Sequence, residues 1–271
     1  MIRDITIGRY FPGNSLLHRL DPRMKTLVVF AMIIMLFLCK NFYSLGLMAL
    51  VIFILSLISK VPLKMLLKSL KPLIFIVIFT AVLNIFYTQG GQELFKFWIF
   101  KVSDKGIYTA VFMATRIILL VTVSSLLTYT TTPTSLTDAL EKLMSPLKVF
   151  KIEVHTIAMM MTLALRFIPT LIEEIDRIMN AQKARGADWE SGSLISRAKA
   201  LIPILVPLFI SSFRRAYELA FAMECRCYTG GQGRTRMKQM KMRFPDFSTA
   251  AFALLLFSAI ILLNLNFVGV I

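Results

Sequence analysis

Residues 107–130 read IYTAVFMATRIILLVTVSSLLTYT, an apolar run in which Arg116 is the single charged side chain. A helix of about 20 mostly apolar residues crosses the hydrocarbon core of a bilayer, and this run is long enough to do so. The rest of the chain agrees, because 57% of its 271 residues are hydrophobic and its mean hydropathy is +0.72. This composition excludes an ordinary soluble domain and predicts a multi-pass membrane protein.

Further apolar runs lie at residues 27–39, 45–59, 73–88 and 248–271. With the first run they predict about five transmembrane helices in an all-α integral membrane fold. We expect three parts in the chain. They are an N-terminal membrane region with four spans (1–131), a cytoplasmic helical module (132–247) and a C-terminal transmembrane helix (248–271).

Positive charge is concentrated in three segments. Of the 31 Lys and Arg residues, seventeen lie in 132–247, five in 1–26 and four in the loop 60–71. Lys and Arg are enriched on the cytoplasmic side of membrane proteins, and anionic lipid attracts them. This distribution accounts for the net charge of +16 without a nucleic-acid partner. Five spans then place the N-terminus, the loop 60–71 and the module 132–247 in the cytoplasm and the C-terminus outside. The outer loop 89–106 is predicted to form an interfacial hairpin or a short amphipathic piece.

Segment 132–247 mixes its charges with apolar residues at helical spacing. A first helix is expected after Thr134, where Ser135 and Asp138 resemble a capping box. Two long helices are expected at about 154–187 and 194–228. In the first of these, one apolar stripe is expected to be buried, formed by Ile157, Met161, Leu165, Ile168, Ile172, Ile175 and Met179.

Two stretches near the ends of these long helices share one pattern. They are Ala181-Gln182-Lys183-Ala184-Arg185-Gly186 and Ala222-Met223-Glu224-Cys225-Arg226-Cys227. Each has an arginine between two small residues, which let another surface approach closely. The planar guanidinium binds a carboxylate or main-chain carbonyls through two parallel bonds, which lysine does poorly. The repeat predicts two docking points, formed by Ala184, Arg185 and Gly186 and by Cys225, Arg226 and Cys227.

A plainer interpretation of Arg185 is also open. A cation in the last turn of a helix complements the helix dipole, and glycine is the usual residue just past a helix end. Arg226 fits this interpretation less well, because the first glycine after it is Gly230.

The sequence predicts no catalytic residue, no bound cofactor and no metal site. His18 and His155 are the only histidines, and neither completes a ligand spacing typical of a metal. The three cysteines, Cys39, Cys225 and Cys227, cannot all pair and are expected to be reduced thiols. Arg116, inside a span, is expected to need a carbonyl, water or a polar partner such as Asn84.

Several motifs resemble the transmembrane T component of energy-coupling factor (ECF) transporters, which take up vitamins and other micronutrients in prokaryotes. The resemblance covers nearly the whole chain. Besides the two arginine motifs it rests on Leu20-Asp21-Pro22-Arg23, Thr130-Thr131-Thr132-Pro133, Leu136-Thr137-Asp138-Ala139-Leu140 and Ala164-Leu165-Arg166-Phe167-Ile168-Pro169.

The resemblance implies a non-catalytic coupling subunit in the plasma membrane of a prokaryote. Arg185 and Arg226 would dock into two ATP-binding-cassette (ABC) ATPase subunits, identical or different, which bind ATP and Mg²⁺ themselves. The long helices would pass the motion of the ATPases to a membrane-embedded S component that binds the vitamin. Adaptable apolar side chains are expected to face that component, namely Met160, Met161, Leu205 and Phe209.

Two other functions are weighed against this one. A pore-forming permease of a conventional ABC importer would form its own translocation pathway and work with a binding protein, whereas a T component binds a separate membrane protein. A membrane-bound enzyme would need a His, Cys or acidic cluster within the spans, and the sequence has none there.

Overall fold

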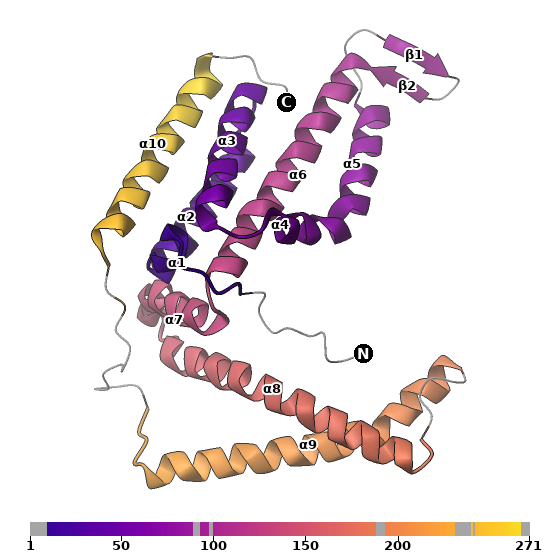
Figure 1. The fold of residues 1–271 in the computed structure, drawn as a ribbon, viewed down its shortest axis with the longest axis vertical. Helices are drawn as coiled ribbons and strands as arrows, with labels where there is room; N and C mark the ends of the chain where they lie inside the picture. Colours follow the sequence, from indigo (N-terminus) through magenta and orange to yellow (C-terminus); the bar gives the residue numbers. More distant parts are fainter. Residues whose placement is uncertain are drawn as a thin grey trace. The chain divides into compact units, whose positions relative to one another are not determined.

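The computed structural model describes residues 10–88, 93–97, 100–187, 193–230, 240 and 242–266 (Figure 1). The chain divides into two compact units. The bundle unit consists of residues 8–139 and 238–271, and the helix-pair unit of residues 1–7 and 140–237.

The bundle unit is helical apart from one antiparallel hairpin in its described residues. Its elements are α1 (Leu16–Arg19), α2 (Pro22–Leu38), α3 (Phe42–Ser59), α4 (Leu63–Leu70), the 3-10 turn η2 (Lys71–Leu73), α5 (Ile74–Tyr87), β1 (Glu93–Phe97), β2 (Phe100–Ser103), α6 (Asp104–Thr130) and α10 (Phe244–Asn266). The predicted all-α fold is confirmed, and the hairpin β1–β2 lies in the loop 89–106, where a hairpin was one of two expectations.

Helix α7 (Pro133–Leu143) begins in the bundle unit and ends in the helix-pair unit. The prediction that Ser135 is the N-cap of α7 is wrong, because the N-cap lies three residues earlier. The hydroxyl of Thr132 accepts a hydrogen bond from the Ser135 backbone N–H at 3.3 Å, so Thr132 caps the helix. Pro133 is then the first helical residue, a position where the missing N–H of proline costs nothing and its fixed φ suits the helix.

Six helices in the described residues are long and apolar enough to cross a membrane. Four contain predicted spans: Phe42–Ser59, Leu63–Tyr87, Asp104–Thr130 and Phe244–Asn266, with mean hydropathies of 2.1 to 2.3. The predicted span 27–39 lies in α2, which has 17 residues and is not among the six. The other two, Val154–Ala184 and Lys199–Cys225, lie in the predicted helical module and are less apolar, at 1.4 and 1.3.

The core of the bundle unit lies among α2, α3, α6 and α10. It is formed by large apolar side chains that are almost fully buried, including Met35, Leu36, Met48, Ile52, Phe112 and Ile260. These come from four helices that are up to 225 residues apart in sequence, so the bundle closes only when the C-terminal helix packs beside α2 and α3.

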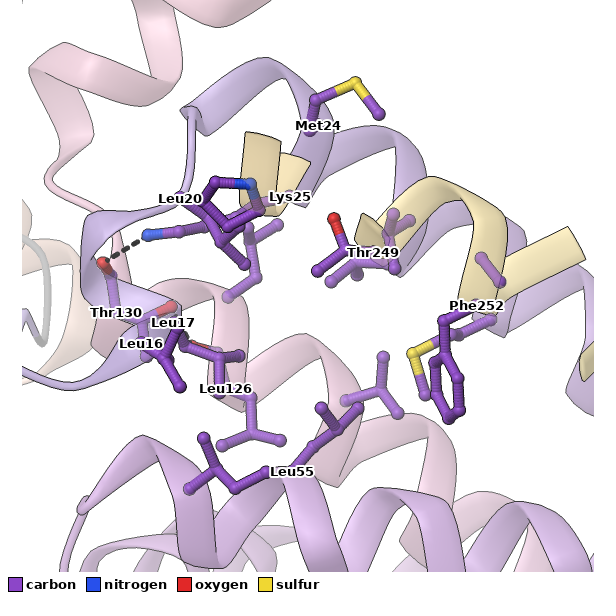
Figure 2. Close-up of a pocket in the computed structure, with 18 of the residues that line it drawn as sticks. Leu16, Leu17, Leu20, Met24, Lys25, Leu55, Leu126, Thr130, Thr249 and Phe252 are labelled. Atoms are coloured by element: carbon purple, nitrogen blue, oxygen red, sulfur yellow. Dashed lines mark hydrogen bonds between the residues drawn. The ribbon is translucent and has the colours of Figure 1, made fainter. Parts of the chain in front are cut away.

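Two buried cations join α2 to α6. Lys25, in the first turn of α2, donates from Nζ to the carbonyl of Thr130 at the end of α6 (3.0 Å; Figure 2). Arg116 of α6 donates in return to the carbonyl of Cys39, just past the end of α2, and its guanidinium carbon lies 4.7 Å from the centre of the Phe112 ring. The carbonyls at the C-terminal end of a helix lack hydrogen-bond partners within that helix. Lys25 of α2 supplies one at the end of α6, and Arg116 of α6 supplies one at the end of α2.

The partner expected for Arg116 was a carbonyl, water or a polar side chain such as Asn84. The carbonyl is confirmed. Among the described residues Asn84 is not hydrogen-bonded to Arg116, and its amide donates to the Thr80 carbonyl of its own helix at 2.8 Å.

Asp246 holds the start of α10 against the start of α2. Its buried carboxylate accepts hydrogen bonds from the backbone N–H groups of Asp21 (2.8 Å) and Arg243 (2.7 Å). Asp21 in turn caps α2 by accepting from the Arg23 N–H at 2.9 Å. At the other end, the Asn264 amide donates to the Leu38 carbonyl at 2.8 Å, so the two helices run parallel over their whole length.

Candidate docking site on the helix pair

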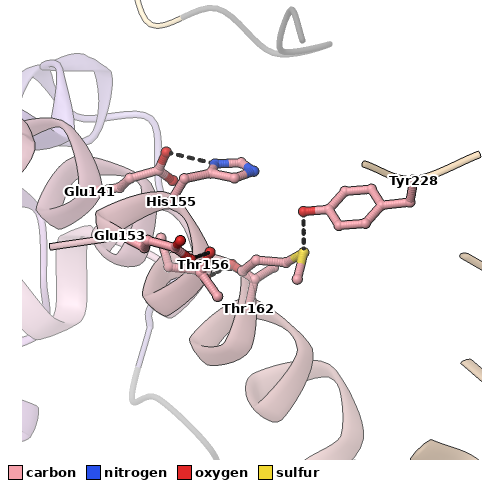
Figure 3. A network of polar contacts seen from close by, with 8 residues as sticks. Glu141, Glu153, His155, Thr156, Thr162 and Tyr228 are labelled. Atoms are coloured by element: carbon pink, nitrogen blue, oxygen red, sulfur yellow. Dashed lines mark hydrogen bonds and ion pairs between the residues drawn. The ribbon is translucent and has the colours of Figure 1, made fainter. Parts of the chain in front are cut away.

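The helix-pair unit contains the 3-10 helix η3 (Ser145–Phe150) and two long helices, α8 (Val154–Ala184) and α9 (Leu194–Cys225). Both long helices were predicted from the sequence, and the structure confirms them. The start of α8 is held by polar contacts (Figure 3). His155 Nδ1 lies 3.2 Å from Glu141 Oε1, and the Thr156 hydroxyl donates to Glu153 at 2.9 Å.

Three side-chain contacts show that α8 and α9 run antiparallel. The Gln182 amide lies against the Pro203 carbonyl, Glu174 pairs with Arg215 at 3.3 Å, and the Tyr228 hydroxyl donates to the Met159 sulfur at 3.0 Å (Figure 3). As the α8 residue number falls, the α9 number rises by a similar amount. The two helices therefore run in opposite directions and contact each other at three places along their length.

The Gln182 contact follows from the prolines of α9. Pro207 has no N–H and cannot bond the carbonyl four residues earlier, which is that of Pro203. That carbonyl accepts from Gln182 Nε2 at 3.4 Å instead. Pro207 thus creates a polar contact between the two helices. Gln182, which makes this contact, lies three residues before Arg185.

The apolar stripe of α8 is only partly buried. Ile157 and Met161 were expected inside but are 37% and 43% exposed, while the five later members from Leu165 to Met179 are half-buried. One antiparallel partner covers one strip of a helix, so the rest of a broad apolar face stays uncovered within this unit.

The two arginine motifs end their helices with the same backbone geometry. At the first, the Ala187 N–H bonds the Gln182 carbonyl (3.0 Å) and the Gly186 N–H bonds the Lys183 carbonyl (3.0 Å). At the second, the Tyr228 N–H bonds the Met223 carbonyl (3.0 Å) and the Cys227 N–H bonds the Glu224 carbonyl (2.8 Å). This pair of bonds is the Schellman motif, with the arginine as the C-cap residue of each helix.

Cys227 adopts the backbone conformation that Gly186 has in the first motif. The φ angles of Cys227 and Gly186 are 53° and 84°, both in the left-handed region. The plainer interpretation of Arg185, a cation at a glycine-terminated helix end, was expected to fit Arg226 less well. The structure shows that both arginines end their helices in the same way, so helix capping does not distinguish them.

Both tips are exposed. All six residues proposed for docking, Ala184, Arg185, Gly186, Cys225, Arg226 and Cys227, lie on the surface. Within the described part of the chain, neither guanidinium forms a hydrogen bond or an ion pair. By contrast, the nearby Arg177 pairs with Glu173 at 3.8 Å and Arg215 with Glu174. Among the described residues, the tips therefore present exposed guanidinium groups without an intramolecular partner.

The antiparallel pairing sets the tips far apart. Arg185 lies near the Gln182–Pro203 contact, and Arg226 near the Met159–Tyr228 contact. The stretch of α8 between these contacts is about 35 Å long at roughly 1.5 Å per residue. Two points at this separation suit two binding grooves better than one.

The residues expected to face a membrane partner divide between the two ends. Met160 and Met161 follow Met159 at the end near Arg226, whereas Leu205 and Phe209 follow Pro203 at the end near Arg185. All four are exposed, by 43% to 65%. The structure does not bring them into one cluster, and each tip has its own exposed apolar pair.

The difference between Gly186 and Cys227 leads to a prediction about helix ends. A left-handed backbone costs an L-residue roughly 1–2 kcal/mol that glycine avoids. A Cβ built on Gly186 meets no atom within 4 Å, so Gly186→Ala changes only this backbone cost. We expect the substitution to speed hydrogen exchange of the Ala187 amide about fivefold, and Cys227→Gly to slow that of the Tyr228 amide by about twofold or more.

Gly46→Ala serves as the control for this prediction. Gly46 lies within α3, also has open space around its Cβ position and has no positive φ. Alanine should therefore stabilise α3 there. Equal effects of alanine at Gly46 and Gly186 would contradict the assignment of the left-handed cap.

Among the described residues, no group of three or more His, Cys, Asp and Glu side chains is placed to hold a metal ion. Sequence reasoning missed Gln182 and Tyr228, which fix the pairing of the helices. Tyr228 directly follows the second motif, but no local pattern identifies Met159 as its partner.

Comparisons with known proteins all match transport proteins. Residues 13–238 match the family model CbiQ, described as a cobalt transport protein. The energy-coupling factor transporter transmembrane protein EcfT of Ruminiclostridium cellulolyticum is 51% identical over 98% of this chain and 100% of its own length. The proteins of the same name from Clostridium kluyveri and Bacillus subtilis are 54% and 46% identical, over 94% and 92% of this chain and 95% and 94% of their own lengths.

Such similarity runs through both units, including α8, α9 and the two tips. With a family model matched over most of its length and about half of its residues shared with these relatives, the chain belongs to the CbiQ family and is a transmembrane coupling component of an energy-coupling factor transporter, not a catalytic subunit.

Proposed function

We propose that this chain transmits the motion of two ABC ATPase subunits to a membrane-embedded, substrate-binding S component. The observation that carries the proposal is the pair of equivalent tips, each with an exposed arginine at the end of a long helix and without a partner among the residues that the structure describes. ATP and Mg²⁺ are bound by the ATPases in this proposal, and the chain itself holds no cofactor.

The antiparallel pairing supports a mechanical role. Because α8 and α9 contact each other near both ends and at the Glu174–Arg215 pair, a displacement of one tip changes the angle or register of the whole pair. Two ATPase subunits that approach each other on binding ATP would pull both tips together. The exposed apolar residues beside each tip, Met160 and Met161 or Leu205 and Phe209, would transmit that change to the S component.

We further propose that the tips, the N-terminus and residues 132–247 face the cytoplasm of a prokaryotic cell and that the C-terminus is outside. The concentration of Lys and Arg in these segments supports this orientation. Helices α8 and α9 would then lie at the cytoplasmic surface rather than cross the membrane. Their lower mean hydropathies and their charged residues, such as Glu173, Glu174 and Arg215, favour that placement.

The test is affinity purification of the chain from its native membranes, followed by mass spectrometry. We expect ABC ATPases and a small hydrophobic membrane protein to be recovered with it. Recovery of ATPases with a soluble binding protein and no membrane partner would support a conventional importer instead. Absence of any ATPase from the purified material would refute the proposed coupling role.

A further inference from the structure

The bundle unit contains a cavity of about 220 Å³ between α1, α2, α3, α6 and α10 (Figure 2). Its floor is formed by buried apolar side chains, among them Met32, Val123 and Ala253. Its rim is open, since Leu16, Ile58 and Phe252 are 64%, 40% and 50% exposed. The cavity is therefore a recess that opens on the surface of the bundle unit.

The polar groups that reach the cavity already have partners. Lys25 donates to the Thr130 carbonyl, the Thr249 hydroxyl to the Asp246 carbonyl at 2.8 Å, and the Ser248 hydroxyl to the Pro245 carbonyl at 2.9 Å. Water needs two to four polar partners to occupy a cavity, and few remain here. The recess is also larger than an apolar cavity of about 150 Å³ that binds benzene. Its chemistry suits a flexible hydrocarbon chain.

Arginines lie next to the lining residues at one end of the recess. Arg19 and Arg23 flank the lining residues Leu20 and Met24, and Arg243 lies two residues before Pro245. The Nε of Arg23 is buried and has no hydrogen-bond partner among the described residues. Three arginines therefore stand on the segments that line one end of an apolar recess, an arrangement complementary to an amphiphile with an anionic head.

The contacts between helix termini explain why the arginine-bearing segments meet at this end of the recess. The Asp21–Asp246 contact places the start of α10 beside the start of α2, and the Lys25–Thr130 contact places the end of α6 at the same level. At the other end of α2, the connections to α10 are made by the neutral side chains of Asn41 and Asn264.

We propose that this recess binds one acyl chain of an anionic phospholipid from the surrounding membrane, with the phosphate held by Arg19, Arg23 and Arg243. Guanidinium groups bind phosphate through two parallel hydrogen bonds, and acyl chains gain free energy with each buried methylene. The proposal needs only that the bundle unit lies in a membrane. It does not depend on the coupling role or on the docking of ATPases.

The test uses the full-length chain in detergent and counts bound lipid by native mass spectrometry. Phosphatidylglycerol, phosphatidylcholine and oleate are added in turn at equal concentrations. We expect one phosphatidylglycerol per chain. Phosphatidylcholine, which has no net negative charge, and oleate, which has no phosphate, should each bind about tenfold more weakly. Equal binding of phosphatidylcholine would overturn the role of the arginines, and stronger binding of oleate would assign the recess to free fatty acids.

Variants locate the lipid within the bundle. Ala253→Leu adds bulk inside the recess, while Ala251→Leu adds the same atoms on the exposed face of α10. We expect the first to weaken phosphatidylglycerol binding about tenfold and the second to leave it unchanged. A second pair of variants repeats the comparison without changing a core residue. Ser248→Phe, at the exposed rim of the recess, should weaken binding, whereas Ser258→Phe, elsewhere on α10, should not.

A charge comparison completes the test. Arg23→Gln should weaken phosphatidylglycerol binding, whereas Lys40→Gln, at the other end of α2, should not. If neither Ala253→Leu nor Ser248→Phe differs from its control, the lipid lies elsewhere and the proposal is wrong. Recovery of ATPases is not part of the readout, so this result and that of the coupling test are independent.

Discussion

Replacing Arg185 and Arg226 together by alanine should remove the ATPase subunits from the purified complex while the chain stays folded and inserted in the membrane. Each guanidinium is exposed and has no partner within the described part of the chain, so its removal breaks no internal contact there. Hydrogen bonds to charged groups contribute roughly 1.5–3 kcal/mol each. Each single substitution should therefore weaken ATPase binding by about 10- to 150-fold, and the double substitution by more.

Arg177→Ala is the matched control for the double variant. Arg177 lies on α8 and is also an exposed arginine, with 74% of its side chain accessible, but it pairs with Glu173 and lies outside the motifs. It should leave ATPase recovery unchanged. The measurement is the ratio of ATPase to chain after affinity purification, with circular dichroism to check folding. Unfolding of the double variant would indicate that the two arginines stabilise the fold and would contradict their assignment as docking residues.

Lysine substitutions at the same positions test how the tips bind. Lysine keeps the charge but cannot form two parallel hydrogen bonds to one carboxylate or to paired carbonyls. We expect Arg185→Lys and Arg226→Lys to retain only part of the ATPase. Full retention by both would mean that charge alone is sufficient.

Asp246→Ala should be the most destabilising substitution in the bundle unit that leaves the core side chains intact. It removes the acceptor of the Asp21 and Arg243 N–H groups and takes one of two nearby negative charges away from the buried Lys25. A buried donor left unsatisfied costs about 1–3 kcal/mol, and loss of a hydrogen bond to a charged group is of similar size. We expect a loss of about 3 kcal/mol, seen as a fall of about 8 °C in the apparent melting temperature in detergent.

Two control variants distinguish the hydrogen bonds of Asp246 from a general effect of removing a negative charge. Asp246→Asn keeps an acceptor of the same size and should lose less than half as much stability. Asp104→Ala removes an acidic residue from the first turn of α6, where its effect on the helix dipole is roughly 0.3–1 kcal/mol. If the Asp246→Ala variant melts no lower than Asp104→Ala, Asp246 does not hold α10 to α2.

Local patterns were enough to predict the helices. The bilayer needs long apolar runs, and the helices with mean hydropathy above 2 follow directly from the runs at 45–59, 73–88, 107–130 and 248–271. The two long helices after residue 153 were also predicted, because their amphipathic period is a local property. The start of α7 was misplaced because Ser135 and Thr132 are both good caps, and Pro133 favoured Thr132.

The partners of the buried cations were beyond the reach of sequence patterns. Lys25 and Arg116 bind carbonyls 105 and 77 residues away, and every residue has a carbonyl, so no residue type identifies the acceptor. Asn84 was named as a partner of Arg116 because its type is suitable. The packing of α2 against α6 places the Cys39 carbonyl there instead.

The sequence by itself determined the class of the protein, its helical fold and its two arginine motifs, because composition, apolar length and a repeated pattern are all local. The backbone geometry, which the residue types do not reveal, shows that the motifs are equivalent, since Cys227 takes the left-handed conformation of Gly186 through bonds formed at the end of its helix. Only the tertiary structure decided that the exposed apolar pairs lie at opposite ends of α8 and α9. That arrangement depends on an antiparallel register set by three contacts between residues 21 to 69 positions apart.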